Sequence, residues 1–97
     1  MDAIRCRATI RHWDPAKGAG LAVADLPAEA IAALGGLRQQ RVRGRLGGVD
    51  FASNVMPAGG GRLALSVSKA MQAAAGVGIG SEVDIEITAV GRDDADS

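Results

Sequence analysis

The sequence predicts a mostly β fold: a closed six-stranded barrel with two short helices, in which two β-β-α-β repeats are related by a pseudo-twofold axis. Three observations lead to this fold class. Apolar and polar residues alternate along several short segments, as in strands that bury one face. The order strand, strand, helix, strand occurs twice along the chain. The chain has 97 residues, which suits one small domain with a single core.

The first half contains three predicted strands and one helix. In residues 4–10, apolar side chains alternate with arginine and threonine, which predicts the first strand. Residues 20–24 resume an extended apolar run after a loop that contains proline and glycine. Asp25 is expected to cap a short helix, which the two glycines at 35–36 end. Alternating arginines then predict a third strand over residues 41–46.

The second half follows the same order. Residues 49–55 form the predicted fourth strand and residues 63–67 the fifth, with a glycine-rich turn between them. Ser68 is expected to cap a helix that runs to residue 75 and ends at the following glycine. Acidic and apolar side chains alternate along residues 82–88, which predicts the last strand.

The apolar patterns of the two halves superpose when the sequence is displaced by about forty residues without a gap. Character rather than identity is kept at the paired positions: Ala8 with Val49, Ile10 with Phe51, Leu26 with Val67, Val42 with Val83, and Leu46 with Ile87. Neither half can bury its apolar face alone, so the two halves are expected to close one barrel without exposed strand edges. Residues 1–90 are therefore the predicted barrel domain, and residues 91–97 an acidic flexible tail.

Composition argues against several classes of protein. Eleven basic and eleven acidic residues give a formal net charge of zero, which argues against a protein that holds a polyanion through its overall field. Cys6 is the only cysteine; no intramolecular disulfide can form, and we interpret Cys6 as a buried structural thiol rather than a reactive one. The arginine-rich N-terminus lacks the apolar segment of a signal peptide or membrane span. We expect a cytoplasmic protein without membrane association, cofactor or metal site.

A long segment of the second half, RVRGRLGGVDFASNVMPAGGGRLALSVSKAMQAAAGVGIGSEVDIEI, resembles the DUF1905 family of small bacterial and archaeal β-barrel domains of unknown function. The residues that match the family pattern are Val42, Gly44, Gly48, Phe51, Ser53, Pro57, Lys69, Gly76, Gly80 and Val83. The resemblance covers residues 20–90 and implies a six-stranded barrel without a settled activity. Gln72 stands where a basic residue is common and Ser81 where aspartate is frequent, which weakens any polar site carried over from the family.

The segment LSVSKAMQAAAGVGIGSEVDIEI also resembles the strand-helix-glycine-strand unit of AbrB-type swapped-hairpin transcription regulators. In those regulators two copies dimerise into one DNA-binding barrel, whereas here both copies would lie in one chain. The similarity concerns architecture and does not by itself imply DNA binding.

The outward charges of the two halves have opposite signs. The repeat superposes the arginines of the third strand on the acidic residues of the last strand, which predicts a surface with a basic and an acidic side. The candidate anion or partner face comprises Arg5, Arg7, Arg41, Arg43 and Arg45, with Arg11 on the same basic side. Our preferred interpretation is a set of cross-strand ion pairs. Contact with an anion or nucleic acid, and charge-complementary self-association, remain as alternatives.

Three further residues are candidate ligand-binding groups. Trp13 could form a pocket wall, and Ser53 has inward parity, so its hydroxyl could serve a pocket or bond to backbone. Lys69 is the third candidate, although the dipeptide Ser68–Lys69 is better explained as a helix cap than as a catalytic pair. His12 beside Asp14 suggests proton transfer, but no motif links them to a nucleophile, so we predict no catalytic residue.

The predicted function is a non-enzymatic binding or accessory module that engages a small ligand or a protein partner, as a monomer or weak homo-oligomer. One alternative is a nucleic-acid-binding transcriptional regulator of AbrB-like architecture. The other is a small-molecule enzyme that uses His12 near Trp13.

Overall fold

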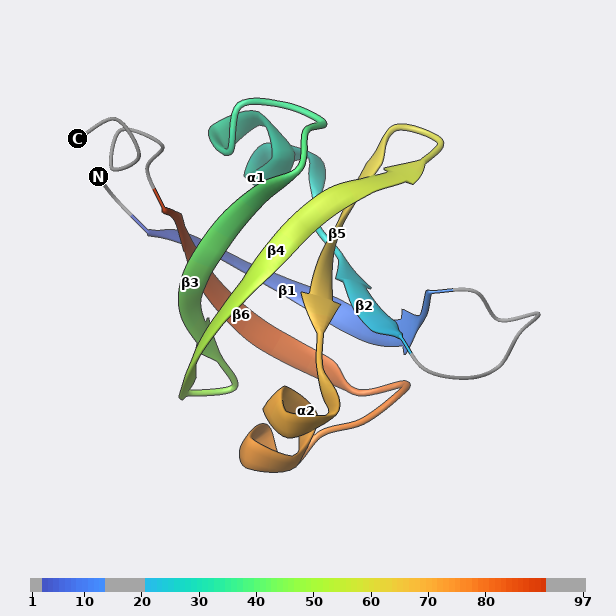
Figure 1. Cartoon of the computed structure of the whole chain (residues 1–97), viewed down its shortest axis with the longest axis vertical. Coiled ribbons are helices and arrows are strands. Elements are labelled where there is room, and N and C mark those ends of the chain that lie inside the picture. Colours follow the sequence, from blue (N-terminus) through green and yellow to red (C-terminus); the bar gives the residue numbers. More distant parts are fainter. Residues whose placement is uncertain (1–2, 14–20, 91–97) are drawn as a thin grey trace.

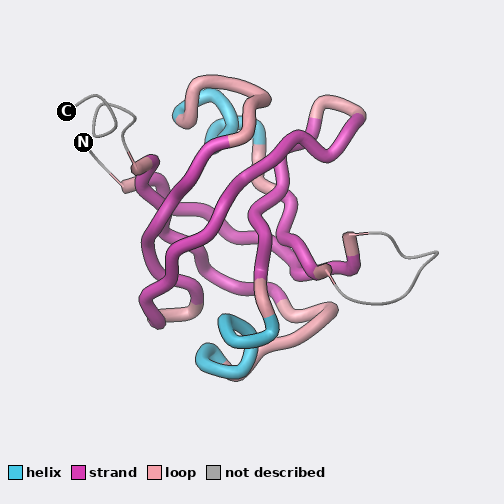
Figure 2. Tube along the Cα trace, viewed as in Figure 1, coloured by secondary structure: helices cyan, strands magenta, loops and turns pink. Residues whose placement is uncertain are grey.

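Six antiparallel strands and two short helices make up the structure, a computed structural model that describes residues 3–13 and 21–90. The strands are β1 (Ile4–His12), β2 (Ala22–Asp25), β3 (Gln40–Leu46), β4 (Val49–Gly59), β5 (Arg62–Val67) and β6 (Glu82–Ala89). They close into a barrel in the order β1-β2-β5-β4-β3-β6 (Figure 1). The helices, α1 (Ala28–Ala33) and α2 (Lys69–Ala75), lie at opposite ends of the barrel (Figure 2). The predicted fold class is confirmed.

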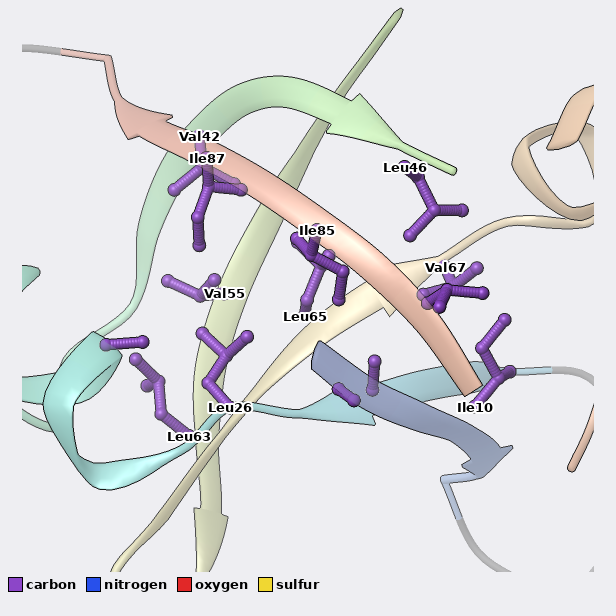
Figure 3. Close-up of a cluster of buried hydrophobic side chains, with 14 of the residues drawn as sticks. Ile10, Leu26, Val42, Leu46, Val55, Leu63, Leu65, Val67, Ile85 and Ile87 are labelled. Carbon is purple, nitrogen blue, oxygen red and sulfur yellow. The ribbon is translucent and has the colours of Figure 1, made fainter. Parts of the chain in front are cut away.

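Aliphatic side chains fill the barrel interior. Most strands turn alternate apolar residues inward, and the largest fully buried side chains include Ile10, Leu46, Leu63, Leu65, Ile85 and Ile87 (Figure 3). Among the described residues, no polar or charged residue is buried. The core of the described barrel is therefore aliphatic, and its charged side chains lie at the surface.

The two helices begin in different ways. The prediction for α2 is confirmed: the amide of Met71 donates to Ser68 Oγ at 3.1 Å. The predicted cap of α1 is wrong, because its N-cap is Pro27, which has no side-chain acceptor, and Asp25 instead ends β2. In the part of the chain that the structure describes, no helix has the length and apolar character of a membrane span.

The strand pairing locates the twofold relation between the two halves. Ala24 pairs with Leu65 where β2 meets β5, and Arg45 pairs with Glu86 where β3 meets β6. In the repeat, Ala24 is equivalent to Leu65, and Arg45 is equivalent to Glu86. Each of these residues therefore pairs with its own equivalent in the other half. The pseudo-twofold axis therefore passes through both ladders, on opposite sides of the barrel.

The superposition of the first strands of the two halves differs from the prediction. Ile10 pairs with Ala24, and Val55 pairs with Leu65, so Val55 rather than Phe51 is the structural equivalent of Ile10. Residues 10 and 24 are 14 positions apart, whereas 55 and 65 are only 10 apart. A displacement without a gap cannot accommodate this difference of four residues. The predicted equivalences between β1 and β4, Ala8 with Val49 and Ile10 with Phe51, were therefore wrong.

Gly44 allows β3 to approach β6 closely. A Cβ atom at this position would collide with the backbone carbonyl of Glu86 and crowd the Cα of Ile87. A glycine inside a strand commonly marks such a close backbone approach. Because Gly44 has no side chain, β3 can lie close to β6 next to the pair formed by Arg45 and Glu86.

Candidate functional site

Outward side chains of four adjacent strands, β1, β6, β3 and β4, form a charged face. Across these strands, Arg5 pairs with Glu86, Glu86 with Arg45, and Arg45 with Asp50. Neighbouring strands lie about 4.8 Å apart, so these side chains form a row of alternating charge. The other polar members of the face are Arg7, Thr9, Arg41, Arg43, Asn54, Glu82, Asp84 and Thr88.

Part of the face is neutralised by its own ion pairs. Arg7 Nε lies 2.9 Å from Asp84 Oδ1, and Arg7 Nη1 lies 4.0 Å from Glu82 Oε1. Arg45 Nε lies 3.3 Å from Asp50 Oδ1. All five side chains are more than 60% exposed, so each pair stabilises the fold by only about 0–1 kcal/mol. The interpretation as cross-strand ion pairs therefore holds for Arg7 and Arg45.

Arg41 and Arg43 have no carboxylate opposite them. Arg43 lies between Thr88 on β6 and Ala52 on β4. Arg41 pairs with Asn54 on one side, and on the other its carbonyl accepts the amide of Val90 at 3.0 Å. Within residues 3–13 and 21–90, neither arginine forms an ion pair. Among the described residues, the end of the face where β3 begins therefore carries surplus positive charge.

The opposite end of the face carries surplus negative charge. There, the guanidinium of Arg7 forms ion pairs with the carboxylates of both Glu82 and Asp84. Glu82 lies opposite an uncharged residue, Thr9. The charge is thus polarised along the direction of the strands.

This arrangement corrects the predicted separation into a basic and an acidic side. Because β6 lies between β1 and β3, the acidic residues of the second half are interleaved with the arginines of the first half. The sequence pattern identified which side chains point outward. It could not identify which strands would be neighbours.

Two shallow grooves run over the charged face. One has a volume of about 520 Å³, and its own lining includes Cys6, Gly48 and Ile85. The other has a volume of about 560 Å³, and its own lining includes Arg43, Gly44, Phe51 and Thr88. Both are also lined by Arg5, Arg45 and Glu86, so the grooves adjoin one another.

The three candidate ligand-binding groups line neither groove. Trp13 is partly exposed after β1, and its amide donates to the carbonyl of Leu21 at 2.9 Å. Ser53 Oγ donates to the carbonyl of Ser66 at 2.6 Å, so its hydroxyl serves the backbone of the barrel wall. Lys69 is exposed at the start of α2.

Arg11 does not belong to the charged face. Its Nε and Nη2 donate to Asp25 Oδ2 and Oδ1 at 2.7 and 2.9 Å, a two-point contact that joins β1 to β2. Its Nη1 donates to the carbonyl of His12 at 3.0 Å. The hydrogen bond from Arg11 holds the pKa of Asp25 below its usual range, and the same bond raises the pKa of Arg11.

His12 and Cys6 show no arrangement for catalysis among the described residues. His12 is partly buried, and its Nδ1 has no hydrogen-bond partner there, while Asp14 lies outside the described ranges. Burial raises the pKa of the Cys6 thiol, and the carboxylate of Glu29 adds to the rise. The thiol is therefore protonated at neutral pH and is a poor nucleophile.

The sequence pattern did not single out three polar residues of the charged face that lie opposite arginines: Asp50, Asn54 and Thr88. Their outward parity follows from the alternation in their strands, but their importance depends on which arginine each one faces.

In residues 3–13 and 21–90, no three histidine, cysteine or acidic side chains are placed to hold a metal ion.

The model of a family described as a domain of unknown function, DUF1905, matches residues 7–87. None of the curated proteins matches the chain.

Proposed function

The chain belongs to the DUF1905 family, and we propose that it is a non-enzymatic binding module that holds an anionic ligand on the charged face. The single observation that carries this proposal is the environment of Arg43. Its directly opposite neighbours on β6 and β4 are Thr88 and Ala52, and within residues 3–13 and 21–90 its guanidinium forms no ion pair, although the carboxylates of Asp50 and Glu86 line the same groove. Arginine binds carboxylate and phosphate groups through two parallel hydrogen bonds.

The neighbourhood of Arg43 can complete such a contact. Thr88 lines the same groove and brings a hydroxyl that can donate to an oxyanion. The next row of the face also lines this groove, and its two cations, Arg5 and Arg45, are balanced by the carboxylates of Glu86 and Asp50, so that Arg43 supplies the surplus positive charge of the groove. The expected ligand therefore carries a carboxylate or a phosphate group.

Two alternatives gain less support. A nucleic-acid backbone that crossed the face would meet Asp84 and Glu86 between the two arginine-bearing strands, and like charges would oppose it. An enzyme using His12 would need a pocket beside that residue, and His12 lines neither of the two grooves.

The first prediction is tested by titrating the isotope-labelled full chain with inorganic phosphate and, separately, with acetate, observed by NMR. We expect saturable shifts of the Arg43 and Thr88 amides in the millimolar range, as for one exposed anion site. Arg43→Gln should abolish them, because glutamine keeps a polar side chain but loses the charge and the paired guanidinium donors. Arg62→Gln is the matched control, since Arg62 is also exposed but lies on β5, outside the face.

Shifts that persist unchanged in Arg43→Gln would refute the proposed site. The affinity of the chain for duplex DNA, measured at increasing salt concentration, tests the alternative of a transcriptional regulator. Binding to DNA that weakens steeply with salt, and that requires several arginines of the charged face, would favour this alternative instead.

A further inference from the structure

The charged face has a basic end and an acidic end, and a single anion would contact only the basic end. Its basic end holds Arg41 and Arg43 without opposing carboxylates. At its acidic end, Glu82 and Asp84 share the one cation of Arg7. A ligand that satisfies both ends must therefore carry an anion and a cation.

The spacing between the two ends suits an extended peptide. From Thr88, beside Arg43, to Asp84 is four residues along β6, or roughly 13 Å at 3.3 Å per residue. In an extended chain, residues four apart lie on the same side and cover that same distance. The two adjoining grooves, with their shared lining of Arg5, Arg45 and Glu86, cover this path.

We infer that the occupant is an extended segment of a partner protein that lies along β6, with acidic side chains over Arg41 and Arg43 and basic side chains over Glu82 and Asp84. This inference rests on the proposed anion site at Arg43 and names the ligand that the site serves. Because the barrel is closed, the segment cannot add a strand to an open edge. Its side chains therefore provide the contacts.

The inference is tested with two nine-residue peptides of identical composition, acetylated and amidated. The block peptide carries aspartate at positions one and three and lysine at positions seven and nine, with serine elsewhere. The interleaved peptide exchanges the charges at positions three and seven, so both peptides are neutral. Only the block peptide matches the polarity of the face along its length.

We expect the block peptide to bind about fivefold more tightly than the interleaved one at low ionic strength, since a few exposed pairs are gained. Its binding should shift the amides of both Thr88 and Asp84. The double variant Glu82→Gln with Asp84→Asn should lose the preference but keep the phosphate shifts at Arg43. Both carboxylates are more than 60% exposed, so this variant should fold.

Equal affinity for the two peptides, or a preference that survives in the double variant, would overturn the inference while leaving the anion site in place. Absence of any Arg43-dependent response to phosphate or acetate would instead overturn the proposed function. The two failures are thus distinguishable in one set of titrations.

Discussion

At the scale of single residues, the site depends on what lies opposite each side chain. Arg43 and Arg45 are two positions apart on the same strand, and both are exposed with the same parity. Yet Arg45 lies between two carboxylates and Arg43 between two uncharged residues. Composition and local pattern cannot distinguish them, because the difference comes from strands that are distant in sequence.

Gly44 is the residue on which the geometry of the face depends most. Replacing it with alanine should destabilise the barrel by about 1–3 kcal/mol, because the added methyl group meets the backbone of β6 rather than a mobile side chain. Urea unfolding measures the loss. Gly78→Ala is the control, since no described atom outside its chain neighbours lies closer than 4.0 Å to the position that its methyl group would take, and it should change stability by less than about 0.5 kcal/mol. Equal effects would show that β3 can move away from β6 at little cost.

At the scale of elements, the period of the sequence predicted most strands well. Alternation in β1, β3 and β6 identified their extent to within two residues and their outward faces. β4 extends beyond the predicted residues to Gly59, because pairing with β5 continues through an irregularity between Pro57 and Gly59. Proline suggested a loop there, yet it is tolerated in a strand at such a bulge.

The same scale shows why Asp25 was assigned wrongly. An aspartate shortly before a proline and a helical segment is typical of an N-cap. In the structure its carboxylate instead accepts two hydrogen bonds from Arg11 on the neighbouring strand. A two-point bond to a guanidinium competes well with a single bond to a backbone amide, and only the pairing of β1 with β2 reveals it.

The pair of Arg11 with Asp25 should make the stability of the β1–β2 pairing depend on pH. The pKa of Asp25 is lowered in the folded chain, so its contribution is complete above the unfolded-state value of about 3.9 and is lost as the pH falls through the folded-state value. Both side chains are about a third exposed, which limits the effect to about 1 kcal/mol or less.

Urea unfolding of the chain and of Asp25→Asn at pH 7 and near pH 2.5 measures this contribution. The difference between the two proteins should shrink on acidification. Asp50→Asn is the control, because the Asp50 side chain is 89% exposed. A difference between the chain and Asp25→Asn that stays constant with pH would contradict the assigned pairing.

At the scale of the whole molecule, the barrel is completed only by contacts between its two halves. β1 with β2 and β4 with β5 pair within a half, but β3 pairs only with β4 and β6, and β6 only with β1 and β3. The third strand of each half therefore has both of its ladders in the other half. This arrangement follows from a pseudo-twofold axis that passes between β2 and β5 and between β3 and β6.

Fragments 1–47 and 48–97, divided at the turn between β3 and β4, should accordingly be unfolded as separate monomers. Each would leave two strands paired and one strand without a ladder, and a single hairpin is at best marginally stable in water. Mixing them should restore the barrel, since all interstrand ladders can form across the break and only the short connection is lost. NMR spectra of one labelled fragment, alone and with its unlabelled counterpart, would show dispersed amides only in the mixture. A dispersed spectrum from either fragment as a monomer would mean that half of this barrel can bury its own apolar face.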